Sequence, residues 1–390
     1  MKISPLRPVV KEAEMLRTIV KKEVLHSIFE NRLTVVFSVC MVLFSASASV
    51  RLHDYRRRLD VYSISSQESS LERPEELSIL VRGLDGIERE YQPPNPLFQV
   101  FIPIDYSYIV EVVLSLMAVL MASGLITGEK ERGTLRLMLS NPVPRHAVLL
   151  GKWLSSSAIL IVSFLVSSIT YVLYVGSAKA VAFSGEDYTR IVLIWLVSAL
   201  YLGCFLNLGL FISTRTHRSS TATVLALIAW IVLVFLIPNL SPLVGKGLTH
   251  PISDQTLEQR RVRTIQHEIR PKRIKKVISV KEYYDRINEL KRRLDEIYRN
   301  SQERFVDLTK RIARFSPASS FMFAVTTLAK TGLEDKGAYK SLYPREEKSR
   351  TQISLSTSLN RALLDIAIIA IFNFLFFLAA YSSFLRYDVR

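Results

Sequence analysis

The chain has 390 residues, and its 51 Lys and Arg against 35 Asp and Glu give a formal net charge of +16. Apolar residues nonetheless make up 49% of the chain, and the mean hydropathy is +0.22. A chain that is strongly basic and yet apolar on average must gather its apolar residues in blocks. This excludes an ordinary water-soluble globule, a disordered chain and a collagen-like chain, and it indicates a membrane protein with charged segments outside the bilayer.

The first segment, residues 1–32, is a basic tail with apolar residues at helical spacing. These residues are Leu16, Ile19, Val20, Val24 and Ile28. The spacing predicts an amphipathic helix that lies in the cytoplasmic interface before the first span. The alternative is that the tail forms the cytoplasmic end of one long first helix. A cleaved signal peptide is not expected, because the charged tail is too long to be its n-region.

Six later segments are apolar over roughly 20 residues, which is the length that crosses a bilayer. They are residues 33–50, 106–127, 148–175, 191–214, 221–243 (with an apolar core at Thr221–Pro238) and 362–385. The predicted fold class is therefore an all-α membrane protein. We expect six transmembrane helices, an N-terminal interfacial helix and a helical extracytoplasmic insert.

The distribution of Lys and Arg predicts which way the spans face. Positive charges gather in the tail, in the loop after the second span, in the short turn after the fourth and in residues 386–390. The short loop 176–190 on the other side carries only Lys179 and Arg190. The excess of positive charge on the cytoplasmic side of membrane proteins then places both termini in the cytoplasm.

Two larger regions, residues 51–105 and 244–361, consequently lie outside. The first ends in Pro93-Pro94-Asn95-Pro96, which is predicted to be an extended approach to the second span. The second carries 26 Lys and Arg against 14 Asp and Glu, so it holds most of the excess charge of the chain.

Within the second region, apolar residues recur mostly every three or four positions from about Val280 to Phe315. They are Tyr284, Ile287, Leu290, Leu294, Ile297, Phe305, Leu308, Ile312 and Phe315. This heptad-like stripe predicts one helix of about 50 Å. It can be buried in two ways. One is an antiparallel hairpin with a helix at Leu257–Arg270 that stops at Pro271, and the other is a coiled coil that joins two copies of the chain.

The densest basic patch of the sequence, Arg270–Lys276, lies in the same region. A solvated helix face is the favoured interpretation of this patch. The alternative is contact with anionic lipid headgroups or another anionic partner. Nucleic acid is not expected as a partner, because the region is placed outside the cell.

Possible metal and redox sites are few. Cys40 and Cys204 both lie in apolar runs, where a buried free thiol is the default state. The six His never recur at i,i+3 or i,i+4 spacing, so no helical metal site is predicted.

The loop after the second span, residues 128–147, carries the most distinctive pattern of the chain. Residues Thr134 to Ser140 are predicted to form a short amphipathic helix, because Gly133 permits a sharp turn before it and Asn141-Pro142 ends it. Its apolar side consists of Leu135, Met138 and Leu139. A short helix that projects from a membrane domain into the cytoplasm suits docking on a soluble partner.

The same loop resembles that of a known family. It reads Gly-Glu-Lys-Glu-Arg-Gly-Thr-Leu from Gly128, then Asn-Pro-Val-Pro-Arg from Asn141, and Leu-Leu-Gly-Lys up to Lys152. This pattern resembles ABC transporter permeases of the type-2, exporter-like superfamily. Three further stretches agree with it, namely Pro93–Leu97, Phe315–Phe321 and Phe384–Arg390. The layout is similar to that of permeases of nitrous-oxide-reductase maturation and of gliding-motility systems, apart from the long basic insert.

The resemblance implies a division of labour in a prokaryotic cytoplasmic membrane. Two permease copies, with a homodimer favoured, form a path among membrane lipids, and two separate ATPase subunits bind ATP and Mg. The loop is then the ATPase-coupling element, and its residues are Glu129, Glu131, Gly133, Thr134, Leu135, Arg136, Met138, Leu139, Pro142 and Arg145. The sequence has no Gly-x4-Gly-Lys-Ser/Thr phosphate loop. We therefore expect no catalytic residue, cofactor or metal in this chain itself.

Charged and amide side chains within the spans form a second group of candidates. Glu111 and Asp365 lie near the outer ends of the second and sixth spans. Snorkelling to the interface, or pairing with Arg361, is favoured for them, and lining a substrate path is the alternative. Asn207 and Asn373 are expected to form interhelical hydrogen bonds.

The favoured function is a permease that exports a substrate or transmits force to an extracytoplasmic protein partner. The alternative is a membrane scaffold or receptor that recruits a partner through its outer helix, but such a protein has no need of the cytoplasmic loop. A carrier driven by an ion gradient favours mid-membrane carboxylates and broken helices in repeated halves, and neither pattern is found. An intramembrane enzyme needs a nucleophile and base, and no such arrangement is found.

Overall fold

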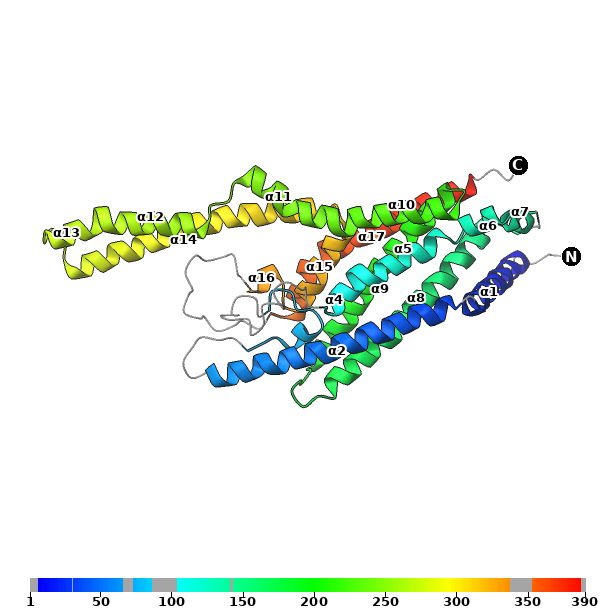
Figure 1. Ribbon diagram of the computed structural model, residues 1–390, viewed down its shortest axis with the longest axis horizontal. Helices are drawn as coiled ribbons and strands as arrows, with labels where there is room; N and C mark the ends of the chain where they lie inside the picture. Colours follow the sequence, from blue (N-terminus) through cyan, green and yellow to red (C-terminus); the bar gives the residue numbers. More distant parts are fainter. Residues whose placement is uncertain are drawn as a thin grey trace.

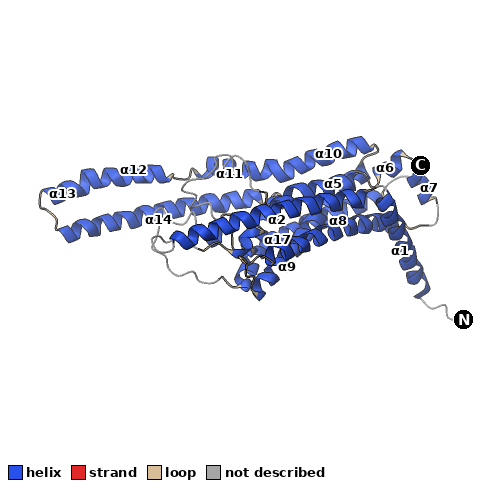
Figure 2. Ribbon diagram, turned by 60° about the horizontal axis from the view of Figure 1, so that its bottom comes forward, coloured by secondary structure: helices blue, strands red, loops and turns tan. Residues whose placement is uncertain are grey.

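The computed structural model describes residues 6–29, 31–65, 73–85, 104–140, 143–336 and 353–386. The regular structure in these ranges is entirely helical (Figure 2). Six of the helices described there are long and apolar enough to cross a membrane. They span Leu33–Ile64, Tyr106–Glu131, Arg145–Gly176, Gly185–Arg215, Ser219–Ile274 and Leu355–Leu385. The predicted class, an all-α membrane protein with six candidate spans, is confirmed.

The N-terminal helix α1 (Leu6–Phe29) is separate from the first span. Asn31 between them adopts a left-handed conformation with φ of 58°, which breaks the helix. α1 then lies at a steep angle to the bundle and packs against α8 (Arg145–Gly176) (Figure 2). The first span belongs to α2 (Arg32–Ser65), so this helix continues well beyond the predicted end of the span at Val50.

The second span is built from short helical pieces. Asp105 begins it, because its carboxylate accepts a hydrogen bond from the backbone N–H of Tyr108 at 2.8 Å. The pieces are α4 (Tyr106–Tyr108), the π-helical turn η2 (Ile109–Leu114), α5 (Ser115–Ser123) and α6 (Thr127–Glu131). After α6 come the short helix α7 (Thr134–Leu139) and then α8.

The 3₁₀ helix η1 (Glu76–Ile79) lies against the end of the bundle opposite α7. The buried guanidinium of Arg51 donates a hydrogen bond to the carbonyl of Ser78 at 2.8 Å, and the hydroxyl of Tyr171 donates one to the carbonyl of Ile79, also at 2.8 Å. α2 and α8 therefore both hold this segment. The predicted extended stretch at Pro93–Pro96 lies outside the described residues.

The fourth span, α9 (Gly185–Arg215), forms the centre of the helical core. It begins with a capping box in which Ser184 and Asp187 satisfy each other's backbone N–H groups. Gly209 is required where α9 crosses α5, because a Cβ at this position would lie 2.4 Å from the carbonyl oxygen of Val119. Such close approach through a small residue is typical of helix packing in membranes.

The fifth span continues into a long arm. The chain runs through α10 (Ser219–Ile231), the π-helical turn η3 (Val232–Leu236) and α11 (Ile237–Thr249). After a break at His250 it continues through α12 (Asp254–Thr264), the π-helical turn η4 (Ile265–Ile269) and α13 (Arg270–Ile274), and then returns as α14 (Val280–Ala313). We call residues 254–313 the arm.

The arm is an antiparallel hairpin, because α14 packs along α11, α12 and α13 (Figure 1). The sequence leaves two ways to bury the apolar stripe of α14, a hairpin or a coiled coil between two copies. In the structure, α14 forms a hairpin with the preceding helices of the same chain. The predicted stop at Pro271 is wrong, because the helix continues to Ile274. Pro271 lies in the first turn of α13, directly after a π-helical turn, where its missing N–H is tolerated.

The last elements return to the bundle. The short apolar helix α15 (Pro317–Leu328) is largely buried and packs against α9 and against α17 (Leu355–Leu385), with α16 (Leu333–Lys336) between them in the chain. Both ends of the chain leave the bundle at the end that carries α6 and α7, and the arm projects from the opposite end (Figure 1).

Candidate functional site

The loop between the second and third spans forms the predicted sharp turn and short helix. Gly133 adopts a left-handed conformation with φ of 71° directly before α7. A Cβ at Gly133 would meet no atom within 4 Å, so its backbone conformation, and not a lack of space, favours glycine here. α7 ends at Leu139, while Asn141 and Pro142 lie outside the described residues.

The faces of α7 differ from the prediction. The periodicity predicts Leu135 on the docking side, but Leu135 is only 1% exposed and belongs to the core of its own chain. Met138 is partly buried against the same core. Among the described side chains of α7, the apolar one that points outward is Leu137, which is 71% exposed. The side chain of Leu139, the third residue of the predicted apolar side, lies outside the described residues. The apolar side of so short a helix packs on its own bundle, and periodicity alone cannot distinguish this packing from docking on a partner.

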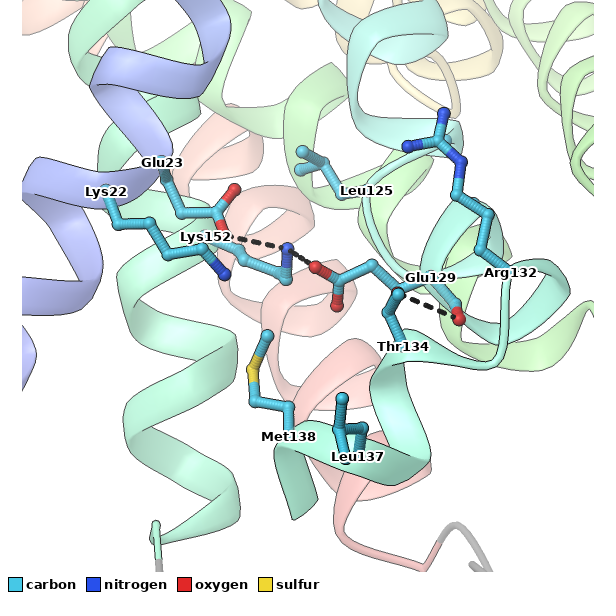
Figure 3. A pocket seen from close by; sticks show the side chains of 11 residues that line it. Lys22, Glu23, Leu125, Glu129, Arg132, Thr134, Leu137, Met138 and Lys152 are labelled. Atoms are coloured by element: carbon cyan, nitrogen blue, oxygen red, sulfur yellow. Dashed lines mark hydrogen bonds and ion pairs between the residues drawn. The ribbon is translucent and has the colours of Figure 1, made fainter. Parts of the chain in front are cut away.

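A buried lysine ties this loop to two other helices. Lys152 on α8 is 2% exposed, and its Nζ lies 2.7 Å from Oε1 of Glu129 on α6 and 3.1 Å from Oε1 of Glu23 on α1 (Figure 3). Glu129 is one of the predicted coupling residues. Lys152 is not among them, although a lysine one or two turns inside an apolar span signals a functional charge.

A cavity of about 450 Å³ lies beside these ion pairs. Its walls come from α1, from the end of the second span, from α7 and from α8 (Figure 3). They include Lys22, Glu23, Glu129, Arg132, Leu137 and Lys152. The second carboxylate oxygen of Glu129, Oε2, is buried and accepts no hydrogen bond within the part of the chain that the structure describes.

The next two residues of the loop fix the ends of two spans. The Nζ of Lys130 donates to the carbonyl oxygens of Thr214 at 2.6 Å and Thr216 at 3.0 Å, at the C-terminal end of α9. The carboxylate of Glu131 accepts a hydrogen bond from the backbone N–H of Ser219 at 3.2 Å, at the start of α10. A cation thus lies at the C-terminal end of α9 and an anion at the N-terminal end of α10, and in both places the helix dipole stabilises a charge of that sign.

Arg145 makes the same kind of contact with the last span. Its Nη1 donates to the carbonyl oxygen of Leu385 at 2.9 Å, at the C-terminal end of α17. The contacts of Arg145, Lys130, Glu131 and Lys152 together connect the region around α7 to α1, α8, α9, α10 and α17.

Two further residues of the predicted ATPase-coupling set, Thr134 and Arg136, are exposed.

The acidic residues predicted near the outer ends of the spans differ from each other. Asp365 is 3% exposed and pairs with Arg314 at the end of α14, with distances of 2.7 Å from Nε to Oδ1 and 3.1 Å from Nη2 to Oδ2. The predicted pairing with Arg361 is wrong, because Arg361 lies 3.1 Å from Asp335 instead. The bonds to Asp365 raise the pKa of Arg314.

Glu111 lies in the π-helical turn η2, and its side chain is partly exposed. Its backbone carbonyl accepts a hydrogen bond from the hydroxyl of Tyr201 at 2.9 Å. Its carboxylate forms no ion pair with a residue in the described ranges. Of the two acidic candidates, Asp365 is therefore the one held in an ion pair within the described ranges.

The predicted asparagine pair is confirmed as a contact between spans. Nδ2 of Asn207 on α9 donates to Oδ1 of Asn373 on α17 at 2.6 Å. Oδ1 of Asn207 accepts a hydrogen bond from Nε1 of Trp153 on α8 at 2.7 Å. Three spans are thus linked through one amide.

Comparison with known proteins agrees with this architecture. The family model described as "ABC-2 family transporter protein" matches residues 17–389, nearly the whole chain. The chain belongs to the ABC-2 transporter family. The resemblance to ABC permeases that the loop motif predicts is therefore confirmed.

Two members of the ABC transporter class share part of this sequence. The "Probable ABC transporter permease protein NosY" of Pseudomonas aeruginosa is 34% identical over 129 residues, which cover 32% of this chain and 45% of that protein. The protein of the same name from Stutzerimonas stutzeri is 34% identical over 128 residues, or 31% and 44% of the two chains. The chain thus matches less than half the length of these curated relatives.

Proposed function

We propose that this ABC-2 family member is the membrane-spanning permease subunit of an ATP-driven transporter, and that separate ATPase subunits dock on the end that carries α7. The observation that carries the proposal is the exposed Leu137 on a helix whose flanking residues contact five other helices. ATP and Mg are then held by the partner subunits, and the chain itself is not an enzyme.

The polar contacts around α7 supply a route for force. A partner that moves α7 also moves α6, and Glu129 passes the motion to α8 and α1 through Lys152. Lys130 and Glu131 pass it to α9 and α10. Buried or partly buried ionic contacts resist being broken, because separation leaves charges unpaired. The loop therefore suits transmission of a movement into the spans.

The proposal includes the orientation and stoichiometry that the family resemblance implies. The end with α7 and both termini faces the cytoplasm of a prokaryotic cell, two ATPase subunits bind beneath, and a second copy of the chain completes a homodimer. The work is either export of a substrate or transmission of force to an extracytoplasmic protein. The pair Arg314–Asp365, which joins the arm to the sixth span, supports the second mode.

Leu137→Asp tests the docking site. Leu137 is 71% exposed, so an Asp there leaves the fold of the chain intact but places an unpaired charge in the subunit contact. Such a charge costs several kcal/mol, enough to weaken association by at least about tenfold. We expect the variant to insert normally and to lose copurification with its ATPase, or stimulation of ATP hydrolysis.

Val277→Asp is the matched control, because Val277 is 68% exposed and lies at the far end of the arm. It is expected to bind and stimulate the ATPase as the unaltered protein does. Full copurification and full stimulation with Leu137→Asp would show that α7 is not the docking helix.

A further inference from the structure

The tip of the arm, residues 270–281, exposes an unusual set of aliphatic side chains. Ile274 is 71% exposed, Val277 68% and Val280 57%. Single exposed apolar residues are normal on a protein surface, but three within seven residues at the end of a hairpin form a cluster. Such a cluster indicates contact with something apolar.

The same twelve residues include six Lys or Arg and no Asp or Glu. Arg270, Lys272, Lys275 and Lys276 make no ion pair with any residue in the described ranges. Further along the arm, by contrast, several arginines are paired on their own helices. Examples are Arg261 with Glu258 at 2.9 Å, Arg286 with Glu282 at 2.8 Å and Arg311 with Asp307 at 2.9 Å. The rest of the arm, residues 254–269 and 282–313, carries 11 Lys and Arg against 10 Asp and Glu, so the net positive charge of the arm is concentrated at the tip.

The turn at the end of α13 keeps these residues outward. The backbone N–H of Val277 donates to the carbonyl of Lys272 at 2.8 Å, and that of Lys276 donates to the carbonyl of Arg273 at 2.9 Å. This is the Schellman ending of a helix, in which a glycine usually takes the left-handed position. Here Lys276 takes it, with φ of 55°, and Val277, which in this motif often packs back on the helix, is exposed.

The position of the tip decides what it can reach. The arm continues the direction of the fifth span, away from the end that carries α7 (Figure 1). The 21 residues from Asp254 to Ile274 place the tip about 30 Å beyond α11, at 1.5 Å per residue. The tip therefore points away from the bilayer that holds the spans.

We propose that residues 270–281 bind the surface of a second membrane that contains anionic lipid, facing the membrane that holds the spans. The unpaired Lys and Arg complement the anionic headgroups, and Ile274, Val277 and Val280 enter the boundary between headgroups and acyl chains. A protein partner fits less well, because contact surfaces between proteins are depleted in Lys and enriched in aromatic residues. This proposal is independent of the site on α7.

Flotation of the full chain with vesicles tests the proposal. The chain is held in nanodiscs of phosphatidylcholine and mixed with vesicles of phosphatidylcholine, with or without phosphatidylglycerol. Binding is expected only to the vesicles with phosphatidylglycerol, and it is expected to weaken as salt is added. Lys272→Glu with Lys275→Glu should lower the affinity at least about tenfold, because two attractions become repulsions.

Two further variants separate the effect of charge at the tip from a general effect of charge and from the effect of the aliphatic side chains. Arg260→Glu with Arg292→Glu makes the same charge change at exposed positions on the shaft of the arm and should leave binding nearly unchanged. Ile274→Ser with Val277→Ser keeps every charge and should weaken binding if the aliphatic side chains enter the membrane.

Three results would overturn the proposal. The first is no binding to vesicles with phosphatidylglycerol. The second is equal loss in the tip and shaft variants, which would show a general effect of charge. The third is binding to polyglutamate but not to vesicles, which would show that the tip recognises an acidic protein.

Discussion

Lys152 is the residue that ties the loop to both α8 and α1. It is nearly fully buried and forms ion pairs with both Glu129 and Glu23. Lys152→Met keeps the length of the side chain but leaves two carboxylates close together without a cation. Removal of one partner from a buried ion pair costs about 3–5 kcal/mol, so we expect a clear fall in the thermal unfolding temperature in detergent.

The matched control is the triple variant Lys152→Met, Glu23→Gln, Glu129→Gln. It removes all three charges, so it should recover most of the lost stability. An unfolding temperature as low as that of Lys152→Met alone would show that the single variant acts through packing and not through the unpaired carboxylates.

Gly209 sets the distance between α5 and α9. Gly209→Ala would place its Cβ 2.4 Å from the carbonyl oxygen of Val119 and 2.8 Å from the Cβ of Ala122, so the two helices must move apart. Overpacking of this kind costs about 1–3 kcal/mol, which a thermal unfolding measurement in detergent would detect. Gly247→Ala is the control, because a Cβ at Gly247 on α11 meets nothing within 4 Å. If the two variants unfold at the same temperature, the crossing of α5 and α9 does not need a glycine.

Among the elements, the arm and the sixth span are joined by a largely buried ion pair, between Arg314 directly after α14 and Asp365 on α17. Arg314 and Asp365 have side chains 21% and 5% exposed, whereas Arg293 and Glu289 on the shaft of the arm are 72% and 59% exposed. A double-mutant cycle with Ala at Arg314 and Asp365 should give a coupling energy of about 1–3 kcal/mol. The same cycle at Arg293 and Glu289 should give less than about 1 kcal/mol, since exposed pairs contribute little. Equal coupling energies would mean that the arm is not fastened to the span through this pair.

The helices themselves were largely predictable from the sequence, because a span needs a long apolar segment and α14 needs an apolar stripe of helical period. The partners of single residues were not predictable. Asp365 pairs with Arg314, 51 positions away in the chain, and not with the nearby Arg361. Pro271 lies inside the helical run of the arm because a π-helical turn precedes it. Periodicity describes one helix at a time and carries no information about such distant contacts.

The loop between the second and third spans also shows what the sequence can predict and what it cannot. The turn at Gly133 and the short helix after it follow from local residues. The local residues do not predict which face of α7 is exposed, because that depends on where the bundle lies. In the structure Leu135 is buried and Leu137 is exposed. The contacts of Lys130, Glu131 and Arg145 with other helices likewise depend on the assembled spans.

At the scale of the whole molecule, α7 and both ends of the chain lie at one end, and the tip of the arm lies at the other (Figure 1). The proposed orientation predicts the labelling of single cysteines by an impermeant thiol reagent in intact cells. Arg292→Cys, on the shaft of the arm, should be labelled and Ser140→Cys should not, although both positions are exposed. The native Cys40 and Cys204 are buried, so they should contribute little background. The reverse pattern would place α7 outside the cell.

The central claim is that an ATPase subunit docks on α7, and site-specific crosslinking in intact cells tests it most directly. A photo-crosslinking amino acid is placed at Leu137 in one strain and at Val277 in another, and the crosslinked products are identified by mass spectrometry. Docking on α7 predicts a crosslink to an ATPase subunit from position 137 and none from position 277. A crosslink to the ATPase from position 277, or none from position 137 while the complex remains intact, would contradict the claim.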